Sequence, residues 1–194
     1  TMPPELFTLT EKFLRNPISI LVKKDALTLQ GILQYYINLE GDQQKFSTLK
    51  DIYARLTMNS CIIYCNSIKR VKDLYEAMLY DKYPVARIHG DMTDEERKET
   101  CNDFRNGKVR VLISSNVTAR GLDVQQVSVV INFDLPKDAN IYLHRIGRSG
   151  RWGRKGVAIN FQTKYDSYKL TKIQQYYDTV ITEMPSDYTK HLNI

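Results

Sequence analysis

The sequence predicts a single α/β domain built on an open, mostly parallel β-sheet with helices on both faces. Short runs of Val, Ile and Leu alternate with longer segments in which apolar residues recur at helical spacing. The short runs are apolar without a break, which is typical of strands covered on both faces, and a helix between successive strands makes each crossover parallel. The chain has 194 residues. That length is enough for one well-buried core and too small for two.

Most of the predicted elements lie between residues 46 and 177. Thr93 followed by Glu96 has the pattern of a capping box at the start of a helix. The predicted helices span residues 5–14, 48–57, 68–80, 93–105, 139–146 and 165–177. The predicted strands span residues 32–39, 60–65, 85–89, 109–114, 127–132 and 156–161.

The ends of the chain and its cysteines set further expectations. Residues 1–24 are expected to be a linker remnant with a leading helix or strand, and residues 25–194 the domain itself. Because the first residue is Thr, the chain is expected to be a piece of a longer protein. No apolar run approaches the roughly 18 residues of a membrane helix. The three cysteines show no metal-site pattern and are expected to be buried as small hydrophobic residues.

The most informative segment is the glycine- and arginine-rich stretch that begins at residue 144. Four arginines recur there at a spacing of three, namely Arg145, Arg148, Arg151 and Arg154. Like charges packed so closely repel one another unless an anion neutralises them. Guanidinium groups stay charged and bind phosphate oxygens in pairs, so the pattern favours a phosphate ligand. The net charge of +6 also favours an anionic partner, such as nucleic acid or an acidic membrane surface. The alternative is a solvated basic loop that binds nothing specific.

A second segment, residues 111–123, combines a buried strand with small polar residues at its end. Ser115 and the backbone N–H groups beside it are suited to contact phosphates. Asp123 could accept hydrogen bonds from a ribose, as acidic residues do in nucleotide-binding folds. The alternative for Ser115 and Asn116 is ordinary capping of the strand end.

These segments resemble signature motifs of the DEAD-box RNA helicases of superfamily 2. Residues 144–151 (HRIGRSGR) resemble the sixth motif, residues 111–123 the fifth and residues 62–67 the fourth. Residues 88–92 together with Arg97 resemble the strand end and helix that grip RNA. The resemblance covers essentially the whole chain and implies a C-terminal RecA-like domain of the translation-initiation helicase subgroup. Its nuclear relatives, which act at exon junctions and in ribosomal RNA processing, are favoured.

The resemblance also implies roles for individual residues. Arg151 would be an arginine finger and Arg148 a γ-phosphate contact, so these two are the predicted catalytic residues. The predicted ATP-binding residues are Gly121, Asp123, Arg148 and Arg151. The predicted RNA-binding residues are Asn66, Ser67, Gly90, Asp91, Arg97 and Ser115. His144 and Arg145 are assigned to the contact between domains and to positioning, and no metal ligands are predicted. Two positions depart from the family pattern: Asn116 stands where most members carry Asp, and Asp94 where Gln is usual.

The predicted function is therefore half of an ATP-dependent RNA helicase, an RNA-stimulated ATPase that clamps or unwinds RNA. The chain lacks a Gly-x-x-x-x-Gly-Lys-Ser/Thr loop and an Asp-Glu-Ala-Asp box, so ATP and Mg²⁺ would depend on an N-terminal RecA-like domain, and the isolated domain would be inactive. The expected partners are RNA backbone without sequence preference, that N-terminal domain and a helical-repeat scaffold protein, and no membrane. The expected compartment is the nucleus, including the nucleolus, with the cytoplasm as the alternative. A non-catalytic RNA- or protein-binding scaffold and a DNA helicase are the rival functions.

Overall fold

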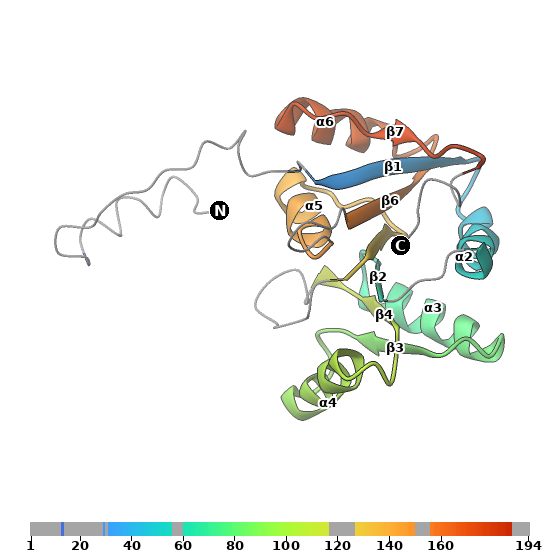
Figure 1. Ribbon diagram of the computed structural model, residues 1–194, viewed down its shortest axis with the longest axis vertical. Coiled ribbons are helices and arrows are strands. Elements are labelled where there is room, and N and C mark those ends of the chain that lie inside the picture. Colours follow the sequence, from blue (N-terminus) through green and yellow to red (C-terminus); the bar gives the residue numbers. More distant parts are fainter. Residues whose placement is uncertain are drawn as a thin grey trace.

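A computed structural model of the chain describes residues 31–55, 60–116, 127–149 and 156–187, together with Phe13 and Leu29. The described strands form one seven-stranded sheet in the order β3-β4-β2-β5-β6-β1-β7, and all neighbouring pairs run parallel (Figure 1). The predicted open α/β sheet with helices on both faces is confirmed. Within the described residues, no helix has the length and apolar character needed to cross a bilayer.

The elements alternate along the chain as the sequence predicts. The strands are β1 (Ile32–Leu39), β2 (Cys61–Tyr64), β3 (Val85–Ile88), β4 (Val111–Ser114), β5 (Val129–Asn132), β6 (Gly156–Thr163) and β7 (Thr182–Glu183). The described helices are α2 (Gln44–Arg55), α3 (Ile68–Tyr80), α4 (Asp94–Arg105), α5 (Ala139–Ile146) and α6 (Ser167–Tyr177).

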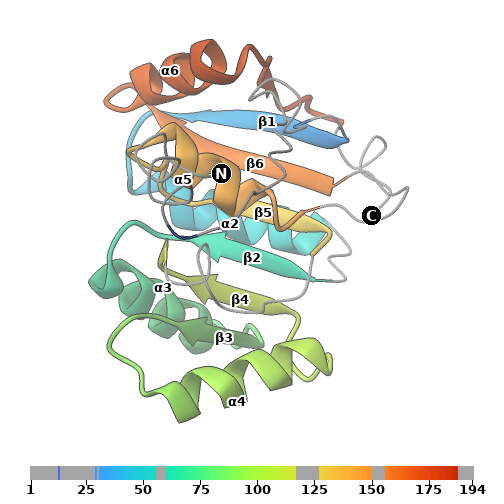
Figure 2. The same ribbon diagram turned by 90° about the vertical axis from the view of Figure 1, so that its left-hand side faces the viewer.

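Successive residues of the central strands belong to two separate hydrophobic layers. Ile63 packs in the layer that α2 and α3 cover. Its neighbours Ile62 and Tyr64 pack in the layer that α4, α5 and α6 cover (Figure 2). All four residues of β2 are buried, and so are those of β4 and β5. Burial on both faces explains why these strands are unbroken apolar runs in the sequence.

Cysteine burial and the capping box follow the sequence prediction. Cys61, Cys65 and Cys101 are free and buried. Burial raises the pKa of the Cys61 and Cys65 thiols well above the ordinary value, so both stay protonated. The Thr93 hydroxyl accepts a hydrogen bond from the Glu96 N–H at 3.2 Å, and the Glu96 carboxylate accepts one from the Thr93 N–H at 2.7 Å.

Element boundaries differ from the prediction where polar residues take the place of an apolar pattern. Helix α2 begins at Gln44, four residues before the predicted start, because the Gln44 side chain accepts a hydrogen bond from the Glu40 N–H and closes the first turn. Strand β7 was not predicted, because two exposed residues carry no apolar signal. The predicted helix 5–14 and the boundary at residue 24 lie, apart from Phe13, outside the described residues.

Replacing the capping residue tests whether local capping holds α4 in place. The Thr93→Ala variant is expected to unfold with a free energy about 1 kcal/mol lower than the wild type, because one N–H at the helix start loses its partner. Chemical denaturation measures this difference. The matched control is Thr171→Ala on the exposed face of α6, which should change stability by less than about 0.5 kcal/mol. Equal effects at both positions would contradict the capping role.

Candidate functional site

Three of the predicted RNA-binding segments lie side by side at one edge of the sheet. Strands β3, β4 and β2 are neighbours, and their carboxyl ends are followed within two residues by Gly90, Ser115 and Asn66, respectively. Backbone hydrogen bonds continue past the strands: the Ser115 N–H donates to the Ile88 carbonyl at 3.2 Å. Parallel strands all present their carboxyl ends at this edge, where open α/β sheets bind ligands. The fold thus gathers segments that are up to 50 residues apart in the sequence.

Acidic residues at this edge are paired with cations. Arg97 donates to the Asp94 carboxylate at 2.7 Å, so the acid that departs from the family pattern neutralises the predicted RNA-gripping arginine. Asp91 accepts a hydrogen bond from Lys72 at 3.0 Å. Both pairs are partly exposed, and such pairs contribute little to stability. They can therefore exchange partners at small cost.

His89 lies beneath this edge in an unusual state. Its side chain is 3% exposed, and neither ring nitrogen has a hydrogen-bond partner among the described residues. Burial, together with the nearby Lys72 and Arg87, lowers the pKa of His89 below its ordinary value. The imidazole is therefore neutral at pH 7, and it supplies no positive charge to the edge.

The predicted RNA-binding residues Asn66 and Ser67 form hydrogen bonds to other groups of this domain. Asn66 donates its backbone N–H to the Asp134 carboxylate at 3.1 Å and its side-chain amide to the Leu135 carbonyl at 2.8 Å. The Ser67 hydroxyl accepts a hydrogen bond from the Arg70 N–H at 3.2 Å and caps α3. The loop after β2 is thus held rigidly at the edge of the sheet.

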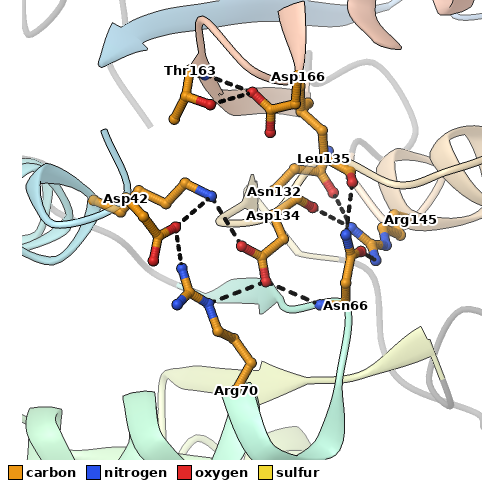
Figure 3. A network of polar contacts seen from close by, with 10 residues as sticks. Asp42, Asn66, Arg70, Asn132, Asp134, Leu135, Arg145, Thr163 and Asp166 are labelled. Atoms are coloured by element: carbon orange, nitrogen blue, oxygen red, sulfur yellow. Dashed lines mark hydrogen bonds and ion pairs between the residues drawn. The ribbon is translucent and has the colours of Figure 1, made fainter. Parts of the chain in front are cut away.

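A buried arginine on α5 joins the strand ends to one another. The Arg145 side chain is fully buried, and Figure 3 shows it pointing at Asn66 and Asn132. Its guanidinium donates to the side-chain oxygens of Asn66 at 2.8 Å, Asn132 at 3.0 Å and Asn116 at 2.6 and 3.0 Å, and to the Asp134 carbonyl at 2.8 Å. We call these four acceptors the Arg145 cage. The cage ties the ends of β2, β4 and β5 to α5.

The guanidinium keeps its charge inside this cage. Burial lowers the pKa of Arg145 to about 10, which is still far above neutral. The guanidinium carbon also lies 5.0 Å from the centre of the Tyr64 ring, a cation–π distance. Directly after the helix, Gly147 makes a turn in which a Cβ atom would come within 2.8 Å of the Leu143 carbonyl oxygen. Only glycine fits there without displacing the backbone, so the start of the arginine-rich segment is fixed relative to α5.

A second polar cluster lies beside the cage and was not predicted. Lys45 is only 4% exposed and contacts the Asp134 carboxylate at 3.0 Å and the Asp42 carboxylate at 3.1 Å. Arg70 bridges the same two carboxylates, contacting Asp134 at 3.4 Å (Figure 3). Although burial raises the pKa of Asp42, hydrogen bonds from Arg70 and Lys45 outweigh this effect and lower it. We call these four residues the charge quartet. Its sequence signal is Lys45, four residues before Leu49 on the apolar stripe of α2.

The remaining predicted site residues are placed only in part. Arg148 is half-buried, and its carbonyl accepts a hydrogen bond from the Val127 N–H at 2.8 Å, so the segment after α5 lies against the start of β5. Gly121, Asp123 and Arg151 lie outside the described residues. Arg145 is fully buried among the described residues. The roles of His144 and Arg145 in the contact between domains and in positioning stay predictions.

The fold agrees with comparisons to known proteins. Residues 44–153 match the helicase conserved C-terminal domain. The chain therefore belongs to the helicase C-terminal domain family. Its structural neighbours place it among the C-terminal RecA-like domains of DEAD-box proteins, and its relatives belong to the translation-initiation subgroup, as the sequence predicts.

Individual relatives show how far the similarity extends. The chain is 52% identical over 187 residues to ATP-dependent RNA helicase FAL1 of Candida glabrata, covering 96% of this chain and 47% of that protein. It is 52% identical over 185 residues to eukaryotic initiation factor 4A of Caenorhabditis elegans, covering 95% and 46%. The structure of S. cerevisiae Dbp5 bound to RNA and ADP BeF3 superposes with a TM-score of 0.88 at 34% identity, covering 99% of this chain and 51% of that one. The chain spans about half the length of the curated relatives it matches.

Replacing the buried arginine tests the importance of the cage. Arg145→Lys keeps the charge but cannot reach four acceptors from one ammonium group. We expect it to lower the free energy of unfolding by about 2 to 4 kcal/mol, because buried oxygens lose their donors. Chemical denaturation of the domain measures this loss.

The matched control is Arg105→Lys at the exposed end of α4, for which a change below about 0.5 kcal/mol is expected. A stability of Arg145→Lys indistinguishable from that of the control would refute the structural role of the cage.

Proposed function

We propose that this chain is the C-terminal half of an ATP-dependent RNA helicase, an RNA-stimulated ATPase that clamps or unwinds RNA. The proposal depends on the arrangement of this edge. The predicted RNA-binding segments at the ends of β3, β4 and β2 share a rigid support with α5, the helix that leads to Arg148. A support of this kind lets RNA and nucleotide bind to one body. Each ligand would then favour the same closed arrangement with a second domain, and their binding would be coupled.

The RNA contacts would be made to phosphates rather than bases. Ser115 and Gly90 follow strand ends and Arg97 lies on the adjoining helix, so they offer backbone N–H groups, a hydroxyl and a guanidinium, which suit phosphate oxygens and support binding without sequence preference. Gly90 adds a specific argument, because its φ angle is not positive and an added Cβ would meet only the Ile68 Cδ1 atom, at 3.7 Å. Among the described residues nothing requires glycine here, which favours close approach of a ligand as the reason for it.

ATP would bind in the cleft between this domain and an N-terminal RecA-like domain. The described residues fit one wall of such a pocket, since Gly147 fixes the turn that presents the half-buried Arg148. Arg148 and Arg151 would stabilise charge that develops on the transferred γ-phosphoryl group, and Gly121 and Asp123 would hold the nucleotide. Mg²⁺ would be held by the other domain and would neutralise phosphate charge there. The domain on its own would hydrolyse little ATP.

Partners and pathway follow from the relatives rather than from the site. FAL1 and initiation factor 4A are equally similar to this chain at 52% identity, so nuclear and cytoplasmic functions both have support. The solved structure of S. cerevisiae Dbp5 with Gle1 is a precedent for a bound protein partner in this family. We propose a helical-repeat scaffold for this chain, and the nucleus as its compartment.

A non-catalytic scaffold is the second candidate, and the ion pair between Asp94 and Arg97 is the observation that favours it. RNA-stimulated ATPase activity of the complete protein separates the two. Arg151→Ala is expected to lower the rate by ~10³-fold or more if Arg151 is an arginine finger. Arg55→Ala, at the exposed end of α2, is the control and should leave the rate unchanged. Equal rates for the wild type and Arg151→Ala would favour the scaffold.

Gly90 provides a test of the RNA contact that does not depend on catalysis. Gly90→Ala should leave the unfolding free energy within about 0.5 kcal/mol of the wild type, because the added methyl group meets only an ordinary contact. It should nevertheless weaken binding of single-stranded RNA roughly tenfold, because the backbone can no longer approach a phosphate. Fluorescence anisotropy with a labelled oligonucleotide measures the affinity. Unchanged affinity would remove Gly90 from the RNA site.

A further inference from the structure

Among the described residues, the charges around Arg145 do not balance. The charge quartet contains two carboxylates, from Asp42 and Asp134, and two cations, from Lys45 and Arg70, so it is neutral as a unit. Arg145 adds one more positive charge beside it. The Arg145 cage consists of three amide oxygens and one backbone carbonyl, all of them uncharged. The carboxylate of Asp134 is already bound by Lys45, Arg70 and the Asn66 N–H, and it makes no direct contact with the guanidinium in the hydrogen bonds of the described residues.

An uncompensated charge inside a protein acts over a longer range than one in water. The guanidinium is fully buried, and the effective dielectric constant there is far below that of bulk solvent. Two of the cage amides separate it from the outside: Asn66 is exposed and Asn116 is half-exposed. Both directly follow strands whose ends carry the proposed RNA contacts. A phosphate bound at this edge would therefore be separated from the Arg145 guanidinium by about the thickness of one side chain.

We infer that, because the cage is neutral, the positive charge of Arg145 attracts RNA phosphate without direct contact, and that residue 116 determines the affinity of the domain for RNA. The inference rests on the proposed RNA-binding function and names a determinant of its affinity. Asn116 accepts hydrogen bonds from the Arg145 Nε and Nη2 atoms through a single oxygen, and an aspartate would keep both contacts. A carboxylate at position 116 would cancel the charge of Arg145, and the attraction for a phosphate would disappear. Arg145 acts here as a positioning and electrostatic residue and need not touch RNA.

Asn116→Asp in the complete protein is the direct test. It is assayed by fluorescence anisotropy with a labelled single-stranded RNA and a non-hydrolysable ATP analogue. We expect affinity to fall roughly 3- to 10-fold at low salt, with a difference that shrinks as added salt screens the charges. The slope of log affinity against log salt should also become shallower by about 0.7, the value for one phosphate contact on a single strand.

The matched control is Asn140→Asp, on the exposed part of α5, where the Tyr177 hydroxyl can still donate to an aspartate oxygen. It adds the same charge away from the cage and should bind RNA as the wild type does. Asn132→Asp puts a carboxylate on a buried amide of the cage that takes no part in the proposed RNA contacts, and it should weaken binding in the same salt-dependent way. This second variant keeps the test decisive if Asn116→Asp does not fold.

The outcomes separate this inference from the proposed function. Wild-type binding with a salt-dependent loss in Asn116→Asp or Asn132→Asp, and no loss in Asn140→Asp, supports the inference. If the cage variants bind RNA as tightly as the wild type, or if all three aspartate variants bind it equally weakly, the inference is overturned. The RNA-binding function is then unaffected. Failure of the wild type to bind RNA overturns both.

Discussion

The buried guanidinium of Arg145 is the interaction on which the site depends. Parallel strands end in separate loops, and nothing in a sheet alone fixes those loops relative to one another. Here a single planar group with five N–H donors bonds to the ends of β2, β4 and β5 at once. An ammonium or an amide could not satisfy so many acceptors in such different directions. Loss of the donors would leave several buried oxygens without partners, a costly arrangement in a protein interior.

The same guanidinium also connects the strand ends that carry the proposed RNA contacts to the arginine-rich segment that carries the proposed nucleotide contacts. Arg145 lies on α5, and two residues later Gly147 turns the chain so tightly that a side chain would strike the Leu143 carbonyl oxygen. Arg148 follows in the turn, with its carbonyl held by the Val127 N–H. A displacement of the loop after β4 would therefore be transmitted through Asn116 and Arg145 to the arginine-rich segment. For the proposed RNA-stimulated ATPase, rigid coupling of this kind would give a physical basis for RNA and ATP to promote each other's binding.

Sequence alone predicted the fold because the strands of a sheet covered on both faces are apolar along their whole length. Ile62 and Ile63, on opposite faces of β2, are both fully buried, and such a run of consecutive apolar residues can be recognised directly in the sequence. The motifs at the strand ends were also recognisable, since they combine glycines, hydroxyls and arginines within short segments. The polar partnerships were not readable in this way. By spacing, Arg145 is one of four regularly placed arginines, and only the three-dimensional structure shows that it is fully buried whereas Arg148 is half-buried. Likewise, Lys45 and Asp134 are 89 residues apart, and no local pattern pairs them.

We propose that this domain supplies one wall of a nucleotide site that a second domain completes. A crystal structure of the complete protein with single-stranded RNA and ADP–beryllium fluoride is the decisive experiment. We expect the guanidiniums of Arg148 and Arg151 within about 3 Å of the beryllofluoride group, the usual length of a charge-assisted hydrogen bond. We also expect Arg145 to keep its bonds to Asn66 and Asn116. A structure in which Arg148 and Arg151 turn toward their own sheet, with no contact to the nucleotide, would refute the proposed site.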